Sequence, residues 1–228
     1  MTESDPGPPA PPQAPPPRPR AMVYVDGFNL YFGVLKERPA TKWLDLQSFM
    51  DSLRINEEVK GIRYFTALVD PHKHTSPTRD RQKRYHQALS SCQRVEVIHG
   101  KYQLRGVNCR ARCRETYEVP EEKKTDVGIA VRMISDVIDG LLDRLILISG
   151  DSDLEPAVAW IRTRYPAIKI TVYIPQSPGD TTPRRNDTYR SMGVDAKPLP
   201  TGEIHRFQFP NTVELGSGRR VERPREWR

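Results

Sequence analysis

The chain has 228 residues, which is enough for one sizeable α/β domain or two small ones. Its formal net charge of +7 suits a polyanionic partner, although much of the excess arginine lies in the two tails. Three cysteines are too few for a disulfide framework, so we expect a reducing, cytoplasmic compartment. No apolar run is long enough to span a bilayer, and residues 1–20 lack the apolar stretch of a secretory signal, so no membrane partner is expected.

The two ends of the chain differ in composition from the middle. Residues 1–20 hold nine of the 22 prolines, which predicts a disordered, extended Pro-rich tail that acts as a spacer or binds another protein. Residues 201–228 are polar and arginine-rich, and we expect a basic, poorly ordered C-terminal tail. A folded domain is therefore expected over residues 21–200.

Within residues 21–200, strand-like apolar runs alternate with helix-like spacing. We expect strands at 22–25, 61–69, 95–98, 145–149 and 169–174, and an edge strand at 100–105. We expect helices at 30–35, 43–53, 78–91, 125–141, 152–164 and 186–192. Helix starts are expected near Asp45 or Gln47, at Thr125 and at Ser152. This alternation predicts an α/β fold with a mostly parallel central sheet between two helical layers.

The most informative stretch is the apolar run Leu145–Ile148 with the turn that follows it. Such a run is typical of a strand buried on both faces, and Asp151 and Asp153 come directly after it. The carboxyl ends of parallel strands form the edge where α/β proteins bind ligands. A capped, solvated turn would also explain the two carboxylates. Their role therefore depends on which other side chains lie at the same edge of the sheet.

Asp26 ends the strand at 22–25 and adds another carboxylate to the same edge. The glycine pattern of a dinucleotide fold is absent, and Phe28 stands where an aspartyl phosphatase would have a second Asp. Asp126 lies in the first turn of the helix at 125–141, where the helix dipole alone would explain it. Four carboxylates meeting at one edge would instead suit Mg²⁺ or Mn²⁺, which prefer oxygen ligands.

Residues 100–123 interrupt the alternation and form an insertion. Cys109 and Cys113 supply half of a structural zinc site, and Cys92 and His99 are remote candidates for the other half. Arginines surround the two cysteines and suit contacts with phosphate.

Three segments resemble the signatures of the NYN domain, the LabA-like branch of the PIN-like nuclease superfamily. These segments are Val23–Asn29, Lys124–Ala130 and Ile148–Pro156, and the resemblance covers about residues 21–200. It implies a PIN-like three-layer α/β/α fold and metal-dependent cleavage of RNA. It also implies catalytic roles for Asp26, Asp126 and Asp151, metal ligation by these three and Asp153, and a role for Asn29 in orienting Asp26 or contacting substrate.

The chain departs from the family pattern at Arg132, where many members carry a further Asp. This change would weaken metal occupancy and cleavage, or place an arginine against a substrate phosphate. Arg132, Lys124, Ser149 and Ser152 are, with Asn29, the predicted substrate-binding residues.

We expect a ribonuclease in which a metal-activated water at the Asp cluster attacks an RNA phosphodiester. The alternatives are an RNA-binding or regulatory module that does not cleave, and a small-molecule phosphohydrolase. RNA is the expected partner, and the sequence leaves homo-oligomerisation open.

Overall fold

The computed structural model describes residues 17–69, 76–108, 116–176 and 187–228. Most of the predicted Pro-rich tail, the cysteines at 109 and 113 and the loop 177–186 lie outside these residues. None of the described helices is long and apolar enough to cross a membrane.

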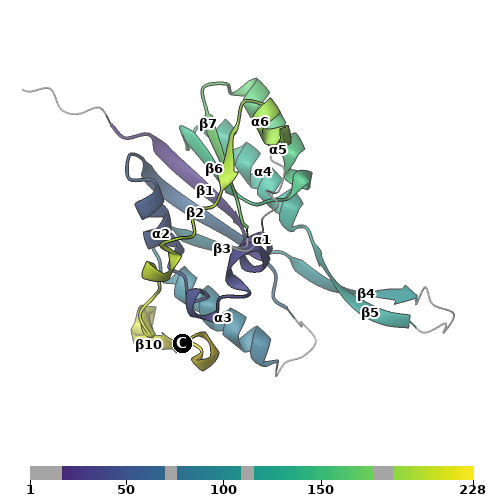
Figure 1. Ribbon diagram of the computed structural model, residues 1–228, viewed down its shortest axis with the longest axis vertical. Coiled ribbons are helices and arrows are strands. Elements are labelled where there is room, and N and C mark those ends of the chain that lie inside the picture. Colours follow the sequence, from purple (N-terminus) through teal and green to yellow (C-terminus); the bar gives the residue numbers. More distant parts are fainter. Residues whose placement is uncertain (1–16, 70–75, 109–115, 177–186) are drawn as a thin grey trace, which may run out of the picture.

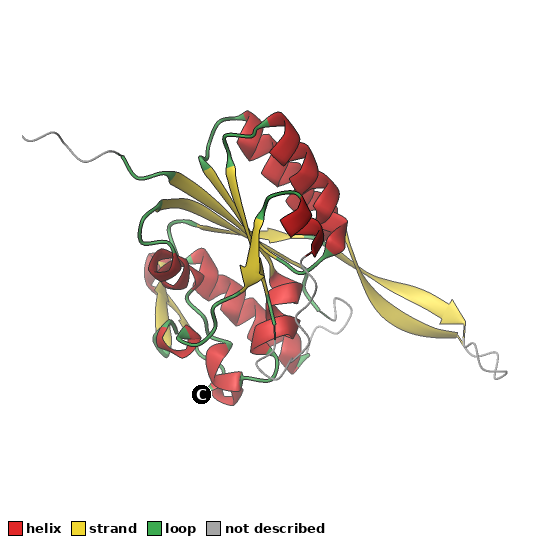
Figure 2. Cartoon of the chain, turned by 45° about the horizontal axis from the view of Figure 1, so that its top comes forward, coloured by secondary structure: helices red, strands yellow, loops and turns green. Residues whose placement is uncertain are grey.

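Six parallel strands form the central sheet, in the order β3-β2-β1-β6-β7-β8. Their bounds are β1 Arg20–Asp26, β2 Glu58–Thr66, β3 Val95–His99, β6 Arg144–Ile148, β7 Lys169–Ile174 and β8 Asp195–Pro198. The main helices are α1 Gly27–Leu30, α2 Leu46–Leu53, α3 Pro77–Ser90, α4 Thr125–Ile138, α5 Glu155–Arg164 and α6 Asp187–Ser191. Helices lie on both sides of the sheet, which confirms the predicted three-layer α/β/α fold (Figures 1 and 2).

The two central strands, β1 and β6, are apolar because both of their faces are covered. Val23 and Val25 point to one face and join the core with α2 and α3, whereas Met22 and Tyr24 point to the other face and join the core with α4 and α5. Side chains alternate along a strand, so each face of β1 contributes to a separate core. This burial holds the carboxyl end of β1, where Asp26 lies, in a fixed position.

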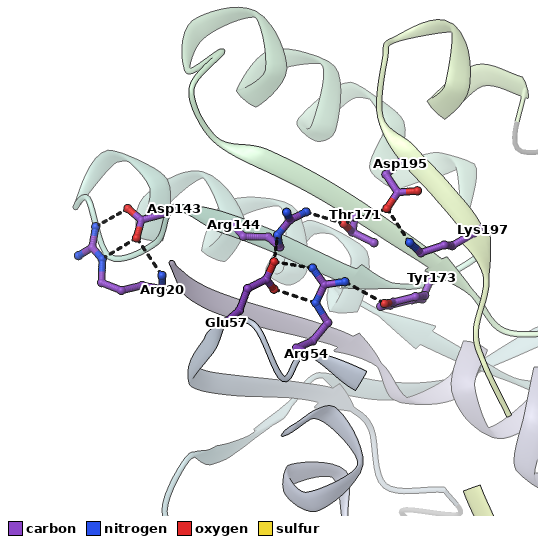
Figure 3. A network of polar contacts seen from close by, with 9 residues as sticks. All are labelled: Arg20, Arg54, Glu57, Asp143, Arg144, Thr171, Tyr173, Asp195 and Lys197. Carbon is purple, nitrogen blue, oxygen red and sulfur yellow. Dashed lines mark hydrogen bonds and ion pairs between the residues drawn. The ribbon is translucent and has the colours of Figure 1, made fainter. Parts of the chain in front are cut away.

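A network of ion pairs ties the amino end of the sheet together (Figure 3). The carboxylate of Glu57 pairs with Arg54 at 2.6 Å and with Arg144, and Arg54 also donates to the Tyr173 hydroxyl at 3.1 Å. Because Arg54 follows α2 and Arg144 begins β6, Glu57 links a helical layer to the centre of the sheet.

The predicted edge strand at 100–105 is not part of the central sheet. β4 (Lys101–Asn108) pairs antiparallel with β5 (Thr116–Lys123) in a separate two-stranded ribbon. This ribbon projects away from the domain (Figures 1 and 2). The sequence did not predict β5, so the strand at 100–105 was assigned to the wrong sheet.

The prediction of a poorly ordered tail at 201–228 is wrong. β9 (Thr212–Leu215) and β10 (Arg219–Glu222) form an antiparallel hairpin. Ile204, Phe209, Val213 and Val221 are buried in the core that contains α2 and α3. Figure 1 shows this yellow segment beside α2 and α3. Its apolar residues are too widely spaced to predict an element, and they are buried only by contacts with distant parts of the chain.

Candidate functional site

Three aspartates from distant parts of the chain meet at the carboxyl edge of the sheet. Asp26 ends β1, Asp126 lies in the first turn of α4, and Asp151 follows β6. One carboxylate oxygen from each lies within 4.8 Å of the others. The strand order explains this convergence, because β1 and β6 are parallel neighbours and end side by side. We call these three residues the Asp cluster.

Asp26 is held rigidly in the cluster. Its side chain caps α1 by accepting from the Asn29 backbone N–H at 2.9 Å, and it also accepts from Asn29 Nδ2 at 2.6 Å and Ser149 Oγ at 3.1 Å. Only 3% of Asp26 is exposed, and this burial raises the pKa of its carboxyl, with a smaller contribution from the charge of Asp151. Asn29 therefore orients Asp26, which is one of its two predicted roles.

Ser149 connects Asp26 to Asp151. Its hydroxyl donates to the Asp26 carboxylate and accepts from the Asp151 backbone N–H at 3.1 Å. Asp151, rather than the predicted Ser152, caps the short 3₁₀ turn Ser152–Leu154 that precedes α5, and its carboxylate accepts from the Asp153 N–H at 3.0 Å. Ser149 is fully buried and positions the two aspartates, and its predicted contact with substrate stays a prediction.

Asp126 contributes the third carboxylate from the first turn of α4, and its surroundings disfavour the charged form. Burial raises the pKa of its carboxyl to about 6, and the charges of Asp151, Asp26 and Asp153 add to this effect. Its helix starts differently from the prediction: the cap is Lys124, in the left-handed region with φ of 80°, and Thr125 is the first helical residue. The turn from β5 into α4 thus brings Asp126 to the end of β1.

Other predicted site residues lie outside the Asp cluster. Asp153 is exposed and does not belong to the set of converging oxygens, although its charge affects Asp126. Ser152 and Lys124 are exposed at the edge, where their predicted contact with substrate stays a prediction. Arg132 forms ion pairs with Asp136 at 3.4 Å and Glu96 at 3.6 Å, so its charge is partnered within the fold.

The family model of the NYN domain matches residues 20–192. The chain belongs to the NYN domain family. Membership of the PIN-like superfamily follows, and the three motifs around the Asp cluster lie within the matched range.

This NYN domain is similar in sequence to a named protein and in fold to a solved structure. The chain is 27% identical over 226 residues to a Pseudomonas putida (strain DSM 28022 / S16) protein named 6-hydroxy-3-succinoylpyridine 3-monooxygenase HspA, covering 85% of this chain and 71% of that protein. It also resembles the crystal structure of a protein of unknown function, VPA0982 from Vibrio parahaemolyticus RIMD 2210633. That match has a TM-score of 0.54 at 23% identity and covers 86% of this chain and 100% of the other, and it supports the fold alone.

The Asp cluster of this NYN domain has the donor set of a hard divalent cation. In the described part of the chain, none of the three carboxylates forms an ion pair with Lys, Arg or His. Three carboxylates so close together repel one another unless a cation is shared between them. Oxygen donors alone suit Mg²⁺ or Mn²⁺, whereas zinc would be expected with His or Cys ligands.

Sequence reasoning missed a cavity of about 270 Å³ that begins at Gly27, directly after Asp26. It is lined by side chains from four parts of the chain, which include Tyr31, Phe32, Tyr64, Tyr85 and Trp227. We call it the aromatic pocket. No local pattern could have revealed it, because its walls are separated by up to two hundred residues.

Proposed function

We propose that this NYN domain is a metal-dependent ribonuclease that hydrolyses RNA phosphodiester bonds at the Asp cluster. The observation that carries this proposal is the convergence of three carboxylates within 4.8 Å, with no ion pair to neutralise them among the described residues. The family supports the proposal, since nuclease chemistry is what the PIN-like fold suggests.

The chain's own residues would prepare the site for Mg²⁺ or Mn²⁺ held by Asp26, Asp126 and Asp151. Asn29 and Ser149 fix the Asp26 carboxylate, so its oxygens need little reorganisation when a cation binds. A bound cation would activate a water molecule and stabilise negative charge on the phosphate. The exposed Lys124 would contact the RNA backbone beside the cluster.

A cleavage assay on an end-labelled single-stranded RNA tests this function. We expect cleavage with Mn²⁺ or Mg²⁺, none with EDTA, and a loss of about a hundredfold or more in Asp151→Asn. Asp139→Asn is the matched control, because Asp139 is an exposed carboxylate at the far end of α4 and should leave the rate unchanged. Cleavage that persists in EDTA and in Asp151→Asn would overturn the proposal. Salt-sensitive RNA binding without cleavage would favour the non-cleaving RNA-binding module instead.

A second candidate function is that of an enzyme acting on a small heteroaromatic substrate. The aromatic pocket beside Asp26 favours it, and the Pseudomonas putida relative is named for activity on a substituted pyridine. Turnover of a hydroxypyridine, with RNA left intact, would favour this candidate over the ribonuclease. Turnover of an aryl phosphate, with RNA left intact, would favour the small-molecule phosphohydrolase instead.

A further inference from the structure

The aromatic pocket and the Asp cluster share one turn of the chain. Gly27 lines the pocket and follows Asp26 directly, so their Cα atoms are about 3.8 Å apart. A Cβ at Gly27 would lie 2.7 Å from Cζ of Tyr64 and 2.7 Å from the Phe65 carbonyl oxygen, so only glycine fits there. Strand alternation places Asp26 on the α4 side of the sheet, and the pocket lies on the α3 side. A ligand that passes over this turn would meet both.

The walls of the pocket present aromatic rings to a ligand. Tyr31 and Phe32 come from the π-helical turn after α1, Tyr85 comes from α3, and Trp227 comes from the C-terminal segment. Phe32 is 57% exposed, so the face of its ring can be reached from solvent. Flat aromatic walls favour a flat aromatic ligand, because rings stack on one another.

The pocket holds two cationic side chains and the carboxylate of Glu226, which leaves Lys42 as its unpaired positive charge among the described residues. Lys42 and Arg81 line it, and burial together with Arg81 lowers the pKa of the Lys42 ammonium. The Lys42 ammonium lies 5.5 Å from the ring centre of Tyr31, and Arg81 is anchored by Glu226 at 3.0 Å. Positive charge close to aromatic walls is the combination that holds a phosphate next to a stacked ring.

His86 lines this pocket and also a second cavity, and it has an unsatisfied hydrogen-bonding atom. Its side chain is 6% exposed, and its Nδ1 lies 3.1 Å from Nε2 of His99. Its Nε2 is buried and has no partner among the described residues. A buried polar atom without a partner is costly. Nε2 can accept or donate, depending on which tautomer the contact with His99 selects.

The size of the pocket limits what it can hold. Its volume of about 270 Å³ is slightly below the roughly 300–1,000 Å³ typical of pockets for drug-sized ligands. It therefore has room for a single nucleobase.

We propose that the aromatic pocket binds one nucleobase of the RNA, next to the phosphodiester at the Asp cluster. This inference rests on the proposed function: binding of a base in the pocket would determine which phosphodiester bond is cut. The base stacks on the aromatic walls, and Lys42 contacts the adjoining phosphate.

Single-stranded RNA oligonucleotides with one abasic nucleotide, moved along the sequence, test the pocket. We expect one abasic position, at a fixed distance from the cut, to raise KM about tenfold with a smaller change in kcat. Phe32→Ala should raise KM for the intact oligonucleotide by a similar factor and remove the effect of the abasic position. Trp160→Ala is the matched control, since Trp160 is an exposed aromatic residue on α5, away from the pocket.

Binding measured without metal separates this inference from the proposed function. If RNA is not cleaved at all, fluorescence anisotropy of the same oligonucleotides still tests the pocket, and the single abasic position should weaken binding in the wild type but not in Phe32→Ala. If RNA is cleaved but no abasic position changes KM, the pocket inference fails and the ribonuclease stands. Displacement of RNA by a free hydroxypyridine, with equal binding of every abasic oligonucleotide, would assign the pocket to a small molecule and overturn the inference.

Discussion

His86 couples the stability of the fold to pH. Burial lowers the pKa of its imidazole to about 4 from the ordinary 6.5, and the neighbouring His99 adds to this effect. Between these pH values the unfolded chain binds a proton that the folded protein does not, so the free energy of unfolding falls as pH falls. We expect this residue alone to remove about 3 kcal/mol between pH 6.5 and 4.

Urea unfolding at several pH values measures this effect. His86→Gln should flatten the fall in stability between pH 6.5 and 4, whereas His205→Gln should follow the wild type, because His205 is exposed. Identical pH profiles for the wild type and His86→Gln would contradict the prediction.

At the scale of elements, Glu57 joins the end of α2 to the start of β6. Its carboxylate pairs with Arg54 and Arg144, and the side chains of all three residues are mostly buried. Removing the carboxylate would leave two nearly buried guanidinium groups without this partner, so Glu57→Ala should lower the free energy of unfolding by about 3 kcal/mol. Glu58→Ala is the control: its ion pair with Lys60 is exposed, and we expect little change. Equal thermal stability of the two variants would show that the network contributes nothing.

Some of the helices and strands could be predicted from the sequence. The strand at 169–174 and the cap at Asp45 are confirmed, because an apolar run and a capping side chain are local signals. The convergence of the Asp cluster was also predictable, since parallel strands end at one edge. The sequence could not show that Asp151 belongs to the cluster and Asp153 does not. The turn that directs Asp151 inward and Asp153 to solvent is held by the hydrogen bond from the Asp151 N–H to Ser149.

The features that the sequence did not predict depend on contacts between distant parts of the chain. The aromatic pocket needs α3, the turn after α1 and the C-terminal segment to come together, and no periodicity records that. The polar composition of 201–228 hid four buried side chains for the same reason. The basic charge of this segment is compatible with order because most of its arginines are exposed, and the half-buried Arg223 donates to the Ala40 and Trp227 carbonyls.

At the scale of the whole molecule, the C-terminal segment should therefore stabilise the domain. Phe209 is buried and packs on Trp43 with ring centres 5.9 Å apart, and the Trp43 indole N–H donates to the Pro210 carbonyl at 2.9 Å. Phe209→Ala should lower the free energy of unfolding by about 3 kcal/mol or more, in a single urea transition shared with the rest of the domain. The exposed Phe32, changed to Ala, should cost little stability. An unchanged midpoint for Phe209→Ala would mean that this segment is the loose tail that its composition suggested.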